Sequence, residues 1–322
     1  MALSTPLHVV SGKGGTGKTT VAAALAMALA DSGKRVLLCE VEGRQGIAQL
    51  FDVAPLPYGE RKIALGLGGG EVHALAIDAE SALLEYLQMY YRLGRAGKAL
   101  DRFGLIDFAT TIAPGVRDVL LTGKVYEAAK RKQNGRFVYD AVVMDAPPTG
   151  RIVRFLSVNQ EVAGLAKVGP VKRQADSIMT MMRSRGTRVH LVTLLEEMPV
   201  QETLDGIAEL HRASLPVGTV IANLVQPALL SHPTQKAVTA GTLSAASVAE
   251  QLTSIGLDPA AADALLAGGQ DHVERQQLQA AQRTELKADE VVELPALDYA
   301  IDQGALFELA GILRAELLGR EA

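Results

Sequence analysis

Residues 11–20 read SGKGGTGKTT, and they constrain what this chain can fold into more than any other stretch. They follow a short apolar run at residues 7–10 and precede a run of small apolar residues at 21–30. From Gly12 onward the sequence fits G-x-x-x-x-G-K-[ST], which between a strand and a helix forms a phosphate-binding P-loop. Its glycines let backbone N–H groups close round phosphate oxygens, and the positive end of the following helix attracts the anion. The sequence therefore predicts a nucleotide-binding loop.

The side chains of this loop have distinct predicted roles. Lys18 is expected to reach the β- and γ-phosphates of bound ATP or ADP, and the Thr19 hydroxyl to ligate Mg²⁺. Lys13 is a second lysine near the start of the loop, as in the deviant pattern K-G-G-x-G-K-T. Such a lysine typically crosses a dimer interface and neutralises transition-state charge at the partner's nucleotide, as an arginine finger does. The alternative is a solvated loop lysine. The predicted nucleotide-binding residues of the loop are Gly12, Lys13, Gly14, Gly15, Thr16, Gly17, Lys18, Thr19 and Thr20.

A hydrophobic strand that ends in an aspartate supplies a second phosphate element. Residues 137–144 read FVYDAVVM, Asp145 follows, and A-P-P-T-G occupies residues 146–150. This is the pattern of a Walker B element, whose carboxylate holds the Mg²⁺ shell, here through a water molecule. The Pro/Gly loop behind it can sense the γ-phosphate. The strand is a weak signal alone and a strong one beside the P-loop.

Two further carboxylates, Glu40 and Glu42, follow a buried strand at residues 35–39. Ligands of parallel sheets sit beyond the carboxyl ends of the strands, so these side chains are expected near the phosphates. The alternative is an ordinary acidic loop.

Composition narrows the class of protein. A chain of 322 residues with 48% hydrophobic residues can bury a core, and its net charge of −4 gives no reason to propose nucleic acid as a partner. Its single cysteine, Cys39, excludes an intrachain disulfide framework and an intrachain multi-cysteine metal site. The longest apolar run, residues 21–30, is about half of what a membrane span needs, and no signal-peptide pattern occurs. A cytoplasmic protein without stable membrane insertion is expected.

The remaining elements predict an α/β fold: a doubly wound, mostly parallel P-loop NTPase sheet with helical subdomain insertions. We expect a single domain over residues 1–322. Met179, Met181 and Met182 would line a groove for hydrophobic clients or, as the favoured interpretation, belong to an ordinary helical core. The expected parts are an α/β core at about 1–78, 136–156, 188–226 and 288–322, helical insertions at about 79–135 and 156–187, and a peripheral helical segment at about 227–287.

With both phosphate elements placed, the chain resembles the ArsA/Get-type deviant Walker A ATPases, which include arsenite-pump ATPases and tail-anchored-protein targeting factors. The stretch D-A-P-P-T-G at 145–150, followed by V-R-F-L at 153–156, is similar to the family's D-T-A-P-T-G-H-T-L-R-F-L. The resemblance implies that Asn223 contacts adenine and that Pro295 lies nearby. It also implies an Mg-ATP-dependent ATPase, a homodimer or a heterodimer with a paralogue, whose opening and closing act on a client protein. The client is unknown.

The departures from the family pattern bear on the chemistry. The family's D-P-A-H segment, whose aspartate activates the attacking water, corresponds here to Glu42-Gly43-Arg44-Gln45. Glu42 is the candidate base, but it is one methylene longer, and a displacement of that order can lower the rate strongly. Arg151 replaces the histidine of the second loop. The zinc-bridging C-x-x-C and the arsenite-binding cysteines are absent, so neither a zinc nor an arsenite site is expected.

Two rival functions remain at this point. One is a nucleotide-dependent regulatory or structural switch with little hydrolysis, which would be the weaker half of a heterodimer with a paralogue. The other is a ParA/MinD-like positioning ATPase, against which the ArsA-like stretch after Asp145 argues. The closing helix at about 304–318 suits peripheral membrane association, but its acidic residues favour packing on the core.

Overall fold

The computed structural model describes residues 6–91, 115–165, 170–286 and 290–318 of the chain. An eight-stranded sheet runs through it in the order β10-β9-β8-β1-β7-β2-β4-β3. Neighbouring strands are parallel except β3 and β4, which pair antiparallel. The predicted doubly wound, mostly parallel α/β fold is thereby confirmed. The strands are β1 (Leu7–Gly12), β2 (Arg35–Glu40), β3 (Arg61–Leu65), β4 (Glu71–Ala76), β7 (Ala141–Asp145), β8 (Thr187–Thr193), β9 (Val217–Val225) and β10 (Val291–Pro295).

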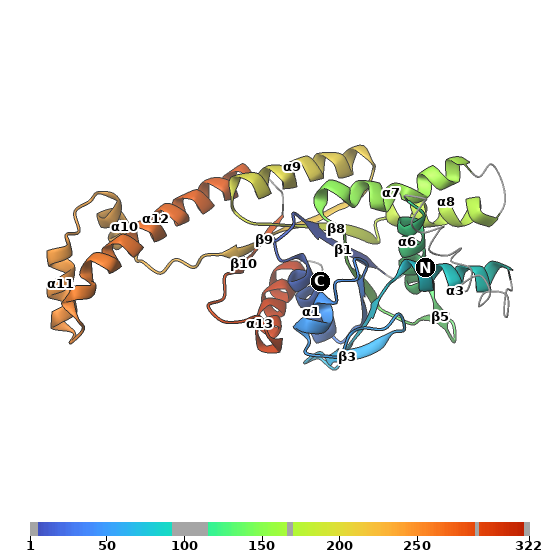
Figure 1. Ribbon diagram of the computed structural model, residues 1–322, viewed down its shortest axis with the longest axis horizontal. Helices are drawn as coiled ribbons and strands as arrows, with labels where there is room; N and C mark the ends of the chain where they lie inside the picture. Colours follow the sequence, from blue (N-terminus) through green and yellow to red (C-terminus); the bar gives the residue numbers. More distant parts are fainter. Residues whose placement is uncertain (1–5, 92–114, 166–169, 287–289, 319–322) are drawn as a thin grey trace.

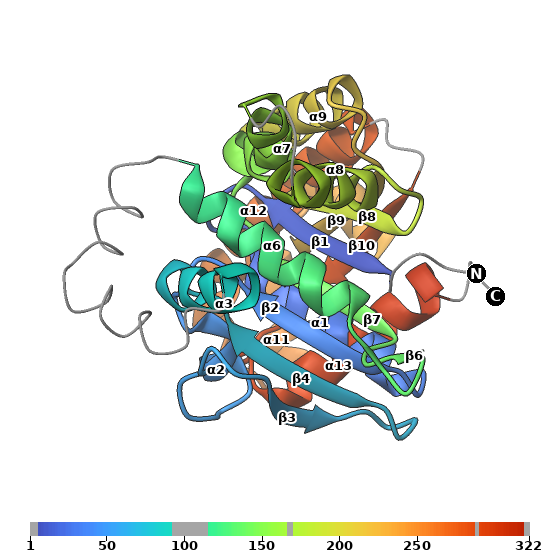
Figure 2. The ribbon, with the colours of Figure 1, turned by 90° about the vertical axis from the view of Figure 1, so that its right-hand side faces the viewer.

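Helices cover both faces of the sheet (Figure 2). One face of the sheet carries α1 (Lys18–Asp31), α2 (Gly46–Leu50) and α13 (Gln303–Leu313), which continues into a π-type turn at Arg314–Leu318. The other face carries α3 (Ala79–Tyr91), α6 (Val116–Lys130), α7 (Thr149–Leu165), α8 (Pro170–Met182) and α9 (Glu197–Arg212).

A short hairpin, β5 (Lys132–Gln133) with β6 (Arg136–Phe137), precedes β7. Within the described residues, no helix is both long enough and apolar enough to cross a membrane.

The helix that follows the phosphate loop lies deep in the core. Every residue of α1 from 21 to 30 is buried, and most are alanine. Small side chains favour helix and allow it to lie close to the sheet on one side and to α13 on the other. In α13 the side chains of Leu306, Leu309 and Leu313 are buried against it. The closing helix therefore packs on the core, as its acidic residues indicated.

Several element boundaries differ from the sequence expectation. The edge strand β3 was not predicted. Its first two residues, Arg61 and Lys62, are charged and exposed, so the strand lacks a continuous apolar pattern. Helix α7 begins at Thr149, directly after the two prolines, rather than near residue 156. Met181 and Met182 are buried in the core between α8 and the sheet, which confirms the core interpretation. Residues 92–114 of the first expected insertion lie outside the described residues.

A helical arm projects from the body (Figure 1). It comprises α10 (His232–Thr239), α11 (Ala245–Ser254), a 3-10 turn at Pro259–Ala261 and α12 (Ala262–Glu285). It leaves the sheet after β9 and returns before β10. Helix α12 begins at Ala262 and continues through Gly268 and Gly269, because the alanine- and leucine-rich residues around them favour helix. The helical segment expected at about 227–287 lies on this arm.

Two buried histidines meet between β1 and β8. His8 Nδ1 lies 3.1 Å from His190 Nε2, and the two rings stack with their planes 12° apart. The backbone N–H of Thr219 donates to His190 Nδ1 at 3.2 Å, so His190 carries its proton on Nε2 and donates it to His8. Burial, reinforced by nearby positive charge, lowers the pKa of His8 to about 4 and that of His190 well below its usual value. Both rings are therefore neutral in the folded protein.

We expect the protein to lose stability as the pH falls from about 6.5 to about 4. In that window a histidine of the unfolded chain binds a proton and the buried His8 does not, so acid favours unfolding by about 3 kcal/mol from this residue. His8→Gln keeps an acceptor for the His190 N–H but does not titrate, so the variant should lose less stability in acid. Urea unfolding across this pH range measures the difference, and an equal loss in both proteins would contradict it.

Candidate functional site

The phosphate loop joins β1 to α1, and two of its glycines are required by close packing. A Cβ at Gly12 would lie 2.2 Å from the carbonyl oxygen of Val192. Gly17 has φ 85°, and a Cβ there would lie 2.3 Å from the Asn223 amide nitrogen. At Gly14 and Gly15, by contrast, an added Cβ would meet nothing within 4 Å. The loop is thus packed against its neighbours at Gly12 and Gly17. At Gly14 and Gly15 no described residue covers it, and a phosphate would lie there.

The loop also organises its own polar groups. The Lys13 carbonyl oxygen accepts from the Thr16 hydroxyl at 2.9 Å and from Lys18 Nζ at 3.3 Å. Lys18 is only 8% exposed, and burial lowers its pKa, an effect that the carboxylates of Asp145 and Glu42 oppose. The helix cap, Gly17, has no side chain to satisfy the first amides of α1. Those amides and the buried amine form the donor set that an anion requires.

Thr19 and Asp145 lie side by side. The Thr19 hydroxyl donates to Asp145 Oδ2 at 2.7 Å. Burial raises the pKa of Asp145 to about 6, and the neighbouring Glu40 carboxylate adds to the rise, while the Thr19 hydrogen bond opposes it. A hydroxyl beside a carboxylate suits Mg²⁺, which prefers oxygen ligands and is usually bound with substrate phosphates rather than in an all-protein cage. The described part of the chain contains no group of three His, Cys, Asp or Glu side chains placed to hold a metal ion.

Glu42 lies between two arginines. Its Oε2 is 3.4 Å from Arg44 and its Oε1 is 3.9 Å from Arg151, which lies in the first turn of α7. The Glu42–Arg151 contact connects the loop after β2 with the first turn of α7. Two of the positions at which the sequence departs from the family pattern, Glu42 and Arg151, are therefore in contact with each other. A 90 Å³ pocket at this point is lined by both arginines and by Arg117.

Glu40 has a structural role that the sequence reasoning missed. It is 2% exposed and stands in register with Asp145 on the neighbouring strand. Its carboxylate accepts from the backbone N–H groups of Gln45 and Ile47, the latter at 3.3 Å. Gln45 adopts a left-handed backbone, and its side chain makes hydrogen bonds in both directions with the backbone of Leu56. Glu40 thus closes the loop that carries Glu42. The available signal was a carboxylate at the end of a fully buried strand.

Lys13 makes an ion pair within its own chain. Its Nζ lies 2.7 Å from Oε1 of Glu202 on α9, and both side chains are partly exposed. The sequence reasoning assigned no role to Glu202. The contact could not be read from sequence spacing, since it joins the loop after β1 to the helix after β8. In this arrangement the Lys13 amine is turned to the rim of the site.

Asn223 lies at the loop and Pro295 does not. The Asn223 amide donates to the Thr16 carbonyl oxygen at 2.9 Å, and the side chain is 5% exposed. Pro295 ends β10 beside Val225, on the same edge of the sheet. Ser11 adds a further link, because its hydroxyl donates to the Pro147 carbonyl oxygen at 2.6 Å. The structure therefore brings the P-loop, Asp145 and Asn223 together, with Glu42 at the rim and Pro295 farther along.

Comparisons with known proteins agree with this geometry. The anion-transporting ATPase family model matches residues 6–185, which include the P-loop, Glu42 and Asp145. ATPase BagA of Mycobacterium tuberculosis is 52% identical over 309 residues, covering 94% of this chain and 91% of that protein. The arsenical pump-driving ATPase of Escherichia coli is 29% identical over 222 residues, covering 67% and 34%. ATPase GET3 of Lachancea thermotolerans is 27% identical over 199 residues, covering 59% and 55%. This chain therefore belongs to the anion-transporting ATPase family and is a nucleotide-binding ATPase.

Proposed function

We propose that the protein binds Mg-ATP at residues 12–20 and hydrolyses it to ADP. The observation that carries this is the Thr19–Asp145 hydrogen bond beside a glycine loop with an open upper side. Lys18 leaves the Lys13 carbonyl and contacts the β- and γ-phosphates. Thr19 and Asp145 would hold Mg²⁺, Asp145 through water. The ion would supply charge neutralisation at the phosphates, as in P-loop NTPases generally.

Glu42 is the proposed base for the attacking water, and Asn223 the proposed contact for adenine. Glu42 lies on the loop after β2, which Glu40 anchors at the edge of the sheet where the nucleotide is proposed to bind. A small shift of this loop is proposed to bring the Glu42 carboxylate toward the phosphates. Asn223 uses its amide N–H₂ on the P-loop, which leaves its carbonyl oxygen for the adenine amino group. Pro295 is proposed to border the base.

We further propose that two chains close face to face, each giving Lys13 to the other's nucleotide. In support, Lys13 is directed to Glu202 at the rim of its own site. The ion pair is then the resting contact of the open form, and closure replaces Glu202 with the partner's phosphates. The second chain is an identical copy or a paralogue.

Nucleotide-driven closure is proposed to act on a client protein through the helices on one face of the sheet. Helix α7 begins at Thr149, four residues after Asp145, so movement of that loop passes directly into it. Helices α6 and α8 pack against α7. The proposed transmitting segments are the helical insertions at about 79–135 and 156–187. The client itself is unknown.

A switch with little hydrolysis is the second candidate, and one observation favours it. Glu42 is paired with Arg44 and Arg151. A general base must lie within hydrogen-bond reach of the water that it activates, and here both carboxylate oxygens of Glu42 are directed at arginines. If this pairing persists in the closed dimer, the chain binds ATP and closes but turns over slowly, and it acts as the weaker half beside a paralogue.

Steady-state phosphate release and equilibrium ATP binding, measured on the same preparation, separate the two candidates. The proposal expects turnover that requires Mg²⁺ and rises more steeply than linearly with protein concentration, because a complete site needs two chains. Hydrolysis that stays undetectable at every concentration, alone and with a co-purifying paralogue, combined with normal ATP affinity, would decide for the switch.

A further inference from the structure

A cavity of about 510 Å³ lies on the side of the molecule away from the arm, among α3, α6, α7 and α8. Most of its wall is apolar. Ala82 and Leu83 of α3, Val119 and Leu120 of α6, and Ile178 of α8 contribute to it. Its volume is within the range of pockets that enclose small organic ligands. None of the residues assigned to ATP lines it.

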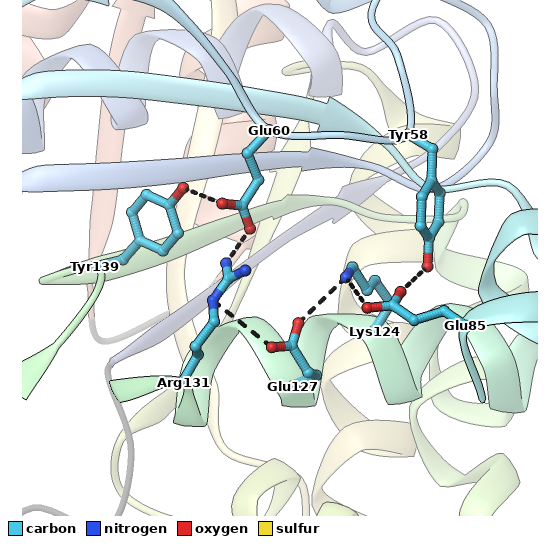
Figure 3. A network of polar contacts seen from close by, with 7 residues as sticks. All are labelled: Tyr58, Glu60, Glu85, Lys124, Glu127, Arg131 and Tyr139. Atoms are coloured by element: carbon cyan, nitrogen blue, oxygen red, sulfur yellow. Dashed lines mark hydrogen bonds and ion pairs between the residues drawn. The ribbon is translucent and has the colours of Figure 1, made fainter. Parts of the chain in front are cut away.

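Figure 3 shows a network of paired charges. One border of the cavity is formed by the members of this network that line it, Tyr58, Glu85, Lys124, Glu127 and Arg131. Lys124 contacts Glu85 at 2.8 Å and Glu127 at 3.3 Å, and the Tyr58 hydroxyl also donates to Glu85. Burial would raise the pKa of Glu85, but the hydrogen bonds from Lys124 and Tyr58 outweigh it and lower the pKa. Glu85 is therefore ionised, and its two oxygens are occupied by Lys124 and Tyr58. The network continues through Arg131, Glu60 and Tyr139.

Gly123 keeps the cavity open against helix α6. It lies in the middle of the helix, where glycine costs about 1 kcal/mol relative to alanine. Among the described residues, an added Cβ would meet nothing within 4 Å, so no described backbone requires a glycine there. Gly123 lines the cavity. The absent side chain therefore adds space to the cavity at the expense of helix stability, as expected where a ligand lies against the backbone.

Lys130 provides positive charge at the rim. It lines the cavity, is exposed, and its amine lies 4.9 Å from the centre of the Tyr126 ring. The ion pairs found among the described residues at this cavity involve Lys124 and Arg131 but not Lys130. An anionic group entering at the rim would gain this contact without displacing a carboxylate.

We propose that this cavity binds a small amphipathic molecule with an apolar, acyl-type body against Gly123 and one anionic head at Lys130. The lining of the cavity is connected to the loop that carries Glu42 and to the helix that follows Asp145. Tyr58 lies two residues after Leu56, which is hydrogen-bonded to Gln45 of that loop, and Asn159 belongs to α7. Occupancy is therefore expected to change the ATPase rate, a part that rests on the proposed function.

The test uses cis-parinaric acid, a fluorescent fatty acid, on the full chain without nucleotide. Wild type is expected to bind one molecule saturably, and dodecanoate to displace it better than dodecanol. Gly123→Phe places an aromatic ring on the cavity side of α6 and should weaken binding at least tenfold. Gly268→Phe, at a helical glycine of the arm that also faces open space, is the matched control and should bind like wild type. Lys130→Gln should remove the preference for dodecanoate over dodecanol.

Absence of saturable binding, or equal affinity in wild type and Gly123→Phe, would overturn the site. Circular dichroism and ATP affinity establish that each variant is folded. Equal displacement by dodecanoate and dodecanol in wild type would overturn the anionic head. Saturable binding that leaves ATP turnover unchanged would overturn only the coupling to the nucleotide, so a failure of the site and a failure of the proposed function are distinguishable.

Discussion

Lys13→Ala is expected to leave ATP affinity within about twofold of wild type and to lower ATP hydrolysis by about 10³-fold or more. The affinity should hold because the Lys13 amine contacts Glu202 and not the open side of its own loop. The rate should fall because a cation delivered to the transferring phosphate stabilises charge that develops only in the transition state. Equilibrium binding of a fluorescent ATP analogue and phosphate release measure the two quantities.

Glu202→Gln is the matched control for this variant. It removes the partner of Lys13 and keeps the lysine, so hydrolysis should persist, and dimers should form at lower protein concentration because the resting ion pair no longer competes. Neither substitution affects the hydrogen bonds that the Lys13 backbone carbonyl oxygen accepts from the Thr16 hydroxyl and the Lys18 amine. Normal hydrolysis by Lys13→Ala would remove the lysine from the mechanism.

Asp145→Asn is expected to lower Mg²⁺-dependent hydrolysis by about 100-fold or more, because metal assistance is worth several kcal/mol in the transition state. The amide oxygen can still accept from Thr19, so the local structure should persist. Burial raises the pKa of Asp145 to about 6, which means that its charged form is disfavoured in the folded apo protein. The neutral asparagine should therefore not lower the free energy of unfolding, and it should raise it at neutral pH.

Two measurements check this variant. Phosphate release is recorded against Mg²⁺ concentration, and urea unfolding is recorded without nucleotide. Lower activity together with lower stability would point to a damaged fold, and a wild-type Mg²⁺ dependence would exclude Asp145 from the metal shell.

Local sequence was sufficient for the phosphate loop and for Asp145. The loop is a contiguous pattern in which Gly12 lies against the Val192 backbone and Gly17 has a left-handed backbone beside the Asn223 side chain, so both positions favour glycine. Asp145 follows a run of buried apolar residues. In a parallel sheet, the end of such a strand lies at the same edge as the phosphate loop after β1. The sheet itself could be predicted for the same reason, since its central strands are continuous apolar runs.

Contacts between distant elements were not predictable. The Lys13–Glu202 pair spans from the first loop to α9, and the role of Glu40 depends on a left-handed backbone at Gln45. Glycine at position 123 gave no sequence signal, because a helical glycine has meaning only once the space beside it is known.

A mixing experiment tests most directly the claim that two chains build each active site. A Lys13→Ala chain keeps an intact phosphate loop but lacks the donated lysine, and a Lys18→Ala chain donates Lys13 but cannot hold its own phosphates. Each alone should be inactive. Mixed in equal amounts, they should recover about a quarter of the wild-type rate, because half of the dimers are mixed and each of those holds one complete site. A mixture no more active than the two variants measured separately would contradict the account.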